Sequence, residues 1–269
     1  MYEFSCTGPV GVEARMGGGT VEIQATGTPE EGVSVDVQPY DDSDAAADAA
    51  ARTRVEMRGD TLVLTAPETS GWILRRSPKI QVVARVPRDS SVRLKIVSAD
   101  VTCHGRYAGI RVNSASGDVY AEHVTGDLTV AGASADLRVV RVDGRLTVSN
   151  ASGDTSAQQI AGPVDVKTAS GDVEIEEAGG DVRAQTASGD IRLGTVRRGT
   201  VGVRSVSGDV SIGVPAGTGV WLDLNTLSGQ THCDLAPTDT PSGRHDLTIQ
   251  ARAVSGDVEV RRVTLPAAA

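Results

Sequence analysis

Pairs of apolar residues separated by a single polar residue recur along the chain from Val101 onward. This spacing of two is the period of a β-strand that buries one face. Successive pairs include Val164/Val166, Val173/Ile175, Val182/Ala184, Ile191/Leu193 and Val201/Val203. Polar residues such as Glu174, Arg183 and Arg192 stand inside the pairs. The pattern predicts a series of short strands whose polar side chains face solvent.

The tripeptide Ser-Gly-Asp punctuates these strands at a nearly constant interval. It occurs at Ser116-Gly117-Asp118, Ser152-Gly153-Asp154, Ser170-Gly171-Asp172, Ser188-Gly189-Asp190, Ser207-Gly208-Asp209 and Ser255-Gly256-Asp257. Degenerate copies are Ser98-Ala99-Asp100, Ser134-Ala135-Asp136 and Ser228-Gly229-Gln230. From Ser98 to Ser188 the step is 18 residues five times in succession, and it then widens to 19, 21 and 27 residues. Each repeat therefore holds two predicted strands joined by glycine-bearing corners.

One repeat cannot bury its apolar face alone, but turns stacked about 4.8 Å apart bury a continuous column and pair every strand in parallel with its copies. The sequence predicts an all-β fold, a single-stranded β-solenoid (parallel β-helix) of about nine 18-residue turns. We place this solenoid in residues 91–269, with the pairing between turns following the repeat step. A stretch rich in Pro, Thr and Ser predicts a loop insertion near 236–245.

Residues 1–90 lack the clean repeat but still alternate as strands do, at Val21–Ala25, Val33–Val37, Thr61–Leu64 and Ile80–Val86. Between these strands, the segment 41–57 is the one helical candidate, with a short helix expected near 43–54. Acidic residues come early in this segment and Arg52 comes late, which complements the helix dipole. Because an uncovered solenoid end is a template for aggregation, we expect residues 1–90 to form a β-rich N-terminal cap.

The composition supports a narrow, repetitive fold and excludes several functions. Aromatic residues make up only 3% of the chain and glycine contributes 31 residues, which suits a thin core of Val, Leu, Ile and Ala. The net charge of −9 argues against nucleic acid as a partner. Three widely spaced cysteines predict free thiols in a reducing compartment. The chain has no long apolar run and begins without an export signal, so we expect a cytoplasmic location and no membrane insertion.

The aspartates of the repeat form the most suggestive column of ionisable residues. Carboxylates stacked about 4.8 Å apart repel each other by roughly 1 kcal/mol even in water, and a calcium ion would relieve the repulsion. The calcium candidates are Asp118, Asp154, Asp172, Asp190 and Asp209. The alternative is a structural corner, in which glycine supplies an unusual backbone angle and aspartate accepts hydrogen bonds from corner amides. The sequence favours the structural corner.

Cys103-His104 and His232-Cys233 together have the composition of a zinc site. On a solenoid they would lie roughly 30 Å apart, far beyond the reach of one metal ion. Both cysteines also fall on apolar columns. We therefore predict buried cysteines, surface histidines and no metal, cofactor or catalytic residues.

A strand-rich start, an Ala/Asp helix and serial Ser-Gly-Asp-Val turns resemble the bacterial toast-rack β-strand repeat family, a domain of unknown function whose members are often labelled adhesins by analogy. A weaker resemblance is to the bactofilins, which are polymer-forming β-helices. The toast-rack resemblance implies a β-helical domain without established catalytic residues and a link to cell-envelope stress systems.

Three functions compete. The sequence favours a non-enzymatic solenoid scaffold or interaction module that binds another protein. The alternatives are a cation- or carbohydrate-binding protein of adhesin type, and a polysaccharide-active enzyme, which would need long loops and sugar-stacking aromatics that the short turns do not supply.

Overall fold

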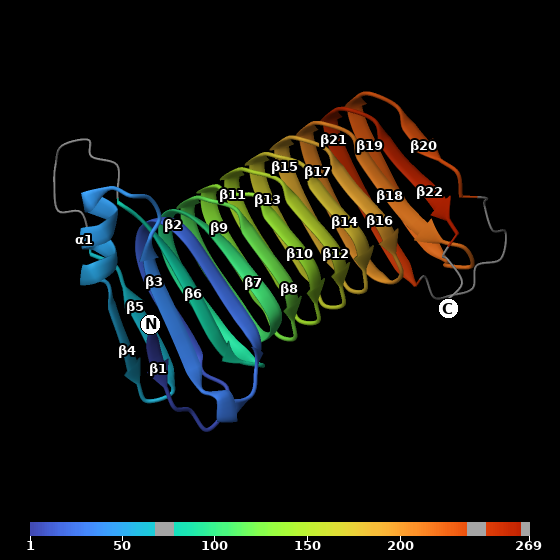
Figure 1. The fold of residues 1–269 in the computed structure, drawn as a ribbon. Coiled ribbons are helices and arrows are strands. Elements are labelled where there is room, and N and C mark those ends of the chain that lie inside the picture. Colours follow the sequence, from blue (N-terminus) through green and yellow to red (C-terminus); the bar gives the residue numbers. More distant parts are fainter. Residues whose placement is uncertain (68–77, 236–245, 265–269) are drawn as a thin grey trace. The chain divides into compact units, whose positions relative to one another are not determined.

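Strands alternate with glycine-bearing corners through most of the protein, in a computed structural model that describes residues 1–67, 78–235 and 246–264. Among these residues, every regular element is a strand except one α-helix and one short 3-10 helix (Figure 1). The predicted all-β solenoid is confirmed. The chain divides into two compact units, Met1–Val139 and Val140–Ala269, and the division falls within β10 (Leu137–Val142).

In the second unit, each turn of the solenoid contributes one strand to each of two parallel-stranded walls (Figure 1). The first wall contains β11 (Leu146–Ser152), β13 (Val164–Ser170), β15 (Val182–Ser188), β17 (Gly199–Ser207), β19 (Val220–Ser228) and β21 (Leu247–Ser255). The second wall contains β12 (Thr155–Ile160), β14 (Val173–Ala178), β16 (Ile191–Val196), β18 (Val210–Pro215), β20 (Thr231–Cys233) and β22 (Val258–Val263). The register follows the sequence repeat, since Val173 pairs with Ile191 and Val164 pairs with Val182.

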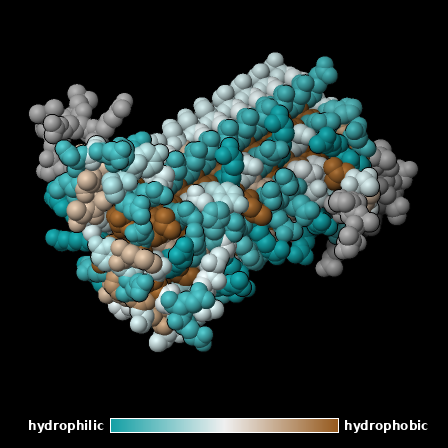
Figure 2. All heavy atoms as spheres, viewed as in Figure 1, coloured by the Kyte–Doolittle hydropathy of each residue, from teal (hydrophilic) through white to brown (hydrophobic). Residues whose placement is uncertain are grey.

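The inward positions of both walls form the core. Val166, Ala184, Ile175, Ile191 and Val201 are completely shielded from solvent. Full burial of a valine or isoleucine side chain contributes about 1.5–3 kcal/mol, so the stacked column stabilises its turns jointly. Hydrophilic side chains cover most of the face drawn in Figure 2, where apolar residues appear as narrow stripes and patches. The alternation predicted from the sequence therefore sorts buried from exposed residues.

The last two turns of the second unit stack out of sequence order. β21 pairs with β17 on one side and with β19 on the other, and β22 lies in the same way between β18 and β20. The turn at 247–263 is thus inserted between the turns at 199–215 and 220–233. This corrects the expectation that pairing follows the repeat step to the end of the chain. The loop predicted near 236–245 lies outside the described residues.

In the first unit, a turn of the solenoid begins much earlier than the visible repeat. β2 (Gly11–Gly27) pairs in parallel with β7 (Ser90–Ser116), from Gly11 opposite Ser91 to Ala25 opposite Gly105. Gly19 stands at the corner, with a φ of +118°, and a Cβ there would lie 1.8 Å from the Ile80 carbonyl oxygen. Only glycine fits this position. The boundary predicted at residue 90 falls inside this unit.

Antiparallel strands and one helix complete the first unit. Its other strands are β1 (Tyr2–Phe4), β3 (Val33–Pro39), β4 (Arg54–Arg58), β5 (Thr61–Thr65), β6 (Lys79–Pro87), β8 (Val119–Val124) and β9 (Leu128–Ser134). β3 pairs antiparallel with both β1 and β6, and β4 pairs antiparallel with β5. The 3-10 helix is Pro29–Glu31.

The predicted helix is confirmed as α1 (Asp44–Arg52), which packs on β3 and β6. The Ser43 hydroxyl accepts the Ala46 N–H at 3.2 Å and caps its first turn. Residues 54–57, at the end of the helical candidate 41–57, belong instead to β4. Within the described ranges, no helix has the length and hydropathy needed to cross a membrane.

Candidate functional site

The Ser-Gly-Asp corners and their Ser-Ala-Asp copies hydrogen-bond to one another within each unit through the aspartate side chains. In the second unit, the Asp172 amide donates to Asp154 Oδ1 at 2.8 Å, and the Asp190 amide donates to Asp172 Oδ1 at 2.8 Å. The same bond joins Asp209 to Asp190 and Asp257 to Asp209. In the first unit, the Asp118 amide donates to Asp100 Oδ1 at 3.1 Å, and that of Asp136 donates to Asp118 Oδ1 at 3.4 Å. Each carboxylate thus supplies an acceptor for the corner beside it.

Glycine and serine complete the corner with backbone groups. Gly171 has a φ of +142°, and a Cβ there would lie 2.2 Å from the Gly153 carbonyl oxygen. The Gly171 amide donates to the Ser188 carbonyl oxygen at 3.0 Å. In the second unit, the row of side-chain acceptors ends at Gln230, whose amide donates to Asp257 Oδ1 at 2.8 Å.

The residues considered as metal ligands have other contacts. Among the described residues, no group of three or more His, Cys, Asp or Glu side chains is arranged to hold a metal ion. That the aspartate column serves as structural corners and not as a calcium site stays a prediction. Cys103 is buried, as expected, but Cys233 is exposed because β20 is the last described strand of its wall and none of the described turns covers it. The His232 imidazole Nε2 lies 2.7 Å from Asp234 Oδ1.

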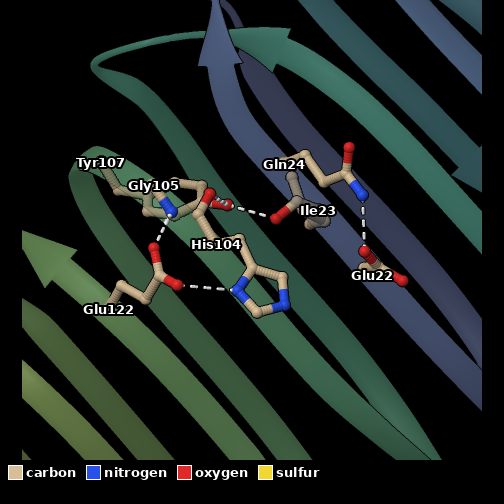
Figure 3. Close-up of polar contacts among 7 residues, drawn as sticks. All are labelled: Glu22, Ile23, Gln24, His104, Gly105, Tyr107 and Glu122. Atoms are coloured by element: carbon tan, nitrogen blue, oxygen red, sulfur yellow. Dashed lines mark hydrogen bonds and ion pairs between the residues drawn. The ribbon is translucent and has the colours of Figure 1, made fainter.

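A polar cluster on β2, β7 and β8 closes a break in the strand pairing of the first unit (Figure 3). The register between β7 and β8 shifts between Cys103 and Arg106. Here the Gly105 amide donates to Glu122 Oε2 at 2.6 Å, while Glu122 Oε1 lies 2.8 Å from His104 Nδ1. The buried Tyr107 hydroxyl donates to the Ile23 carbonyl oxygen at 2.6 Å. A β-bulge of this kind re-aims a side chain, and here it directs His104 toward Glu122.

The electrostatics of this cluster fit a structural role. Partial burial opposes the ionisation of Glu122, but the hydrogen bonds from His104 and Gly105 outweigh it and lower the pKa of Glu122. Burial raises the pKa of the Cys103 thiol to about 12, and burial also raises the pKa of Tyr107. A thiol with so high a pKa is a poor nucleophile. The cluster therefore ties β7 to β8 and β2.

A groove of about 630 Å³ lies on the outer face of the first wall in the second unit. Outward-facing residues of adjacent strands line it, namely Asp165 on β13, Arg183 and Gln185 on β15, Gly202 and Arg204 on β17, and Gln250 and Arg252 on β21. Gly202 stands between Arg183 and Gln250 in the register, and nothing lies within 4 Å of the position of a Cβ there. Because Gly202 has no side chain, the groove is open between Arg183 and Gln250.

The charges in this groove are incompletely neutralised. Four arginines and two aspartates line it, although the whole chain carries a net charge of −9. Within the described part of the chain, the side chains of Arg183 and Arg204 make no hydrogen bond or ion pair. Arg252 lies 3.8 Å from Asp223. The groove thus presents two guanidinium groups that are free to bind an anion.

A second hollow of about 460 Å³ continues from the groove along Arg204 and Arg252. Its apolar lining includes Ala187, Val206 and Val254. Val206 and Val254 are 53% and 47% exposed, which is unusual among the valines of this protein. The basic row is therefore flanked by a row of small apolar side chains.

The chain matches a known protein family over most of its length. The Toastrack DUF4097 family model matches residues 20–261. The chain belongs to the Toastrack family. The resemblance inferred from the Ser-Gly-Asp turns is confirmed. No curated protein matches this Toastrack chain.

Solved structures similar to this Toastrack chain share little sequence with it. A proposed adhesin from Bacteroides fragilis is 13% identical, with 97% of this chain and 95% of that chain covered and a TM-score of 0.43. A proposed lipid-binding protein from Parabacteroides distasonis is 13% identical, with the same coverage and a TM-score of 0.36. A proposed cell adhesion protein from Clostridium sporogenes is 10% identical, with 95% and 93% covered and a TM-score of 0.25.

The groove of this Toastrack domain was not identified from the sequence. Arg183 was recognised only as a polar residue inside an apolar pair, which fixes its outward direction but not its neighbours. The signal lies in the repeat itself, because residues one step apart stand side by side on adjacent strands. Gln185 and Arg204 stand one step apart on β15 and β17, and Glu122 stands one step of 18 residues from His104. Arg252 joins this row only because β21 is inserted beside β17, which the repeat step does not predict.

Proposed function

We propose that this protein is a non-catalytic interaction module whose second unit binds an acidic segment of a partner protein in the arginine groove. The observation that carries the proposal is the pair Arg183 and Arg204, which line the groove without a partner among the described residues. The planar guanidinium group matches a carboxylate with two parallel hydrogen bonds. In an acidic chain, most other surfaces would repel such a segment, which adds specificity.

The lining of the groove also suggests the composition of the partner. The Asp165 Oδ1 atom is shielded from water and lies 3.9 Å from Lys167 Nζ, but it accepts no hydrogen bond from the described residues, so a donor from the bound segment would satisfy it. The neighbouring row of Ala187, Val206 and Val254 accepts small apolar side chains. A segment that mixes carboxylates with small apolar residues fits both rows, whereas a nucleic acid presents its phosphates without small apolar side chains beside them.

Binding of a synthetic peptide of alternating Glu and Val, measured by fluorescence polarisation, tests the proposal. The double variant Arg183→Glu/Arg204→Glu is expected to weaken binding roughly a hundredfold or more, because each of the two lost charge-assisted hydrogen bonds removes about 1.5–3 kcal/mol. Added salt should weaken binding by the wild-type protein in the same direction.

Arg261→Glu is the matched control, because Arg261 is an exposed arginine on β22 of the opposite wall. The Arg261→Glu variant should bind the peptide as tightly as the wild type does. Replacing glutamate by lysine in the peptide should abolish binding to the wild-type protein. Equal binding of the Glu-Val peptide by the double variant and by Arg261→Glu would refute the proposal. The location of the protein in the cytoplasm and its link to envelope stress stay predictions.

A further inference from the structure

In the part of the second unit that the structure describes, the outermost turn has a strand edge without a neighbouring strand. Because the turn at 247–263 is inserted inside the stack, β19 and β20 come last in their walls (Figure 1). Among the described residues, β19 pairs only with β21, and β20 pairs only with β22. One row of backbone N–H and C=O groups on each strand therefore has no described strand beside it. Such edges readily pair with another strand.

The side chains of β19 show the same lack of cover. Leu222 and Leu224 are only half-buried, although Ile249 and Ala251, which pair with them on β21, are completely buried. On the outward face, Trp221 is 43% exposed and Leu227 is 83% exposed. By contrast, the first unit places the antiparallel strands β3 and β4 beside its parallel strands β6 and β5, and β1 lies beside β3. An apolar strand edge of this kind is a binding surface.

The sequence of β19 is complementary to itself about Leu224. In an antiparallel pair of two copies centred on this residue, Trp221 of one copy stands opposite Leu227 of the other. Asp223 stands opposite Asn225, whose amide group can donate to the carboxylate. Leu222 and Thr226 stand opposite each other on the inward face, so the core would continue across the junction. Directly opposite residues in such pairs lie about 4.5–5.5 Å apart and make these contacts.

We propose that two copies of this chain associate end to end through their β19 edges, in an antiparallel pair related by a two-fold axis. The two-fold axis makes the contact isologous, so each copy supplies both halves of every pair. The strand carries a single charged residue, Asp223, which faces an asparagine across the junction and not another carboxylate. The dimer would cover Trp221, Leu227 and the half-buried leucines at once. This inference does not depend on the arginine groove.

Sedimentation velocity on the full chain over a range of concentrations tests the proposal. The wild-type protein is expected to sediment as a dimer at high concentration. Trp221→Lys alone and Leu227→Glu alone should each sediment as monomers, because each places a charge opposite an apolar residue at both ends of the junction. Both positions are exposed in the monomer, so the fold should tolerate the changes; circular dichroism and thermal unfolding check this.

An equimolar mixture of the two variants provides the decisive measurement. In the mixed dimer, Lys from one copy faces Glu from the other, while the remaining Trp221 and Leu227 still face each other, so a dimer should reappear. Val206→Lys is the matched control, because Val206 is exposed on β17 inside the stack. It should remain dimeric. A wild-type monomer at every concentration, or no rescue in the mixture, would overturn the proposal.

Discussion

At the scale of single residues, the β-bulge at Gly105 depends on one ionised side chain. The Glu122 carboxylate accepts the Gly105 amide and contacts His104, and its pKa is lowered by these hydrogen bonds against the opposing effect of partial burial. A carboxyl group with a lowered pKa in the folded state stabilises the protein above its ordinary pKa. That contribution is lost as the pH falls through the folded-state value.

We therefore expect Glu122→Gln to destabilise the protein by roughly 0.5–1 kcal/mol near pH 7, a modest cost because the side chain is partly exposed to solvent. The difference from the wild type should shrink as the pH falls below the ordinary glutamate value of 4.5. Urea unfolding at a series of pH values measures it. Glu174→Gln is the control, since the Glu174 side chain makes no hydrogen bond or ion pair to a described residue. A difference that grows toward low pH would contradict this assignment.

At the scale of structural elements, the corner aspartates act by accepting the amide of the next corner. Asp172→Ala removes the acceptor of the Asp190 amide and should cost about 1 kcal/mol, because the corner is exposed and water replaces part of the bond. Asp172→Asn keeps an acceptor oxygen and should cost less. Gln230→Ala should be neutral, because the Gln230 side chain ends the row and receives no amide from a described residue. Thermal unfolding of the three variants distinguishes them, and an equal cost at both positions would show that the row contributes nothing.

The same corners explain how much of the fold could be predicted from the sequence. Ser-Gly-Asp fixes a glycine angle, a side-chain acceptor and a period, so the strands, their register and their buried faces follow from it. The stacking order of the last turns does not, because a wider step between repeats is compatible with either order. The one local indication of the order was Gln230, which replaces the aspartate of the repeat. A corner at the end of the stack has no further amide to accept, so it needs no aspartate. The exposure of Cys233 was mispredicted for the same reason.

At the scale of the whole molecule, the early turn in β2 and the arginine groove were missed for different physical reasons. In β2 the corner reads Gly18-Gly19-Thr20, so the backbone requirement is met by glycine alone and the repeat is invisible as a motif. The groove exists because Gly202 has no side chain to fill the space between Arg183 and Gln250. A missing side chain has no signature of its own in a single sequence.

Calcium tests whether the aspartate columns act as more than corners. Each stacked carboxylate already uses Oδ1 to accept an amide, so we expect the same unfolding midpoint in excess EDTA and in millimolar calcium at matched ionic strength. The ionic strength must match because salt alone screens the repulsion between neighbouring carboxylates. A site filled at a tenfold excess over Kd would add about 1.4 kcal/mol. A calcium-specific rise in the midpoint that Asp172→Asn and Asp190→Asn abolish would instead establish a cation site along the column.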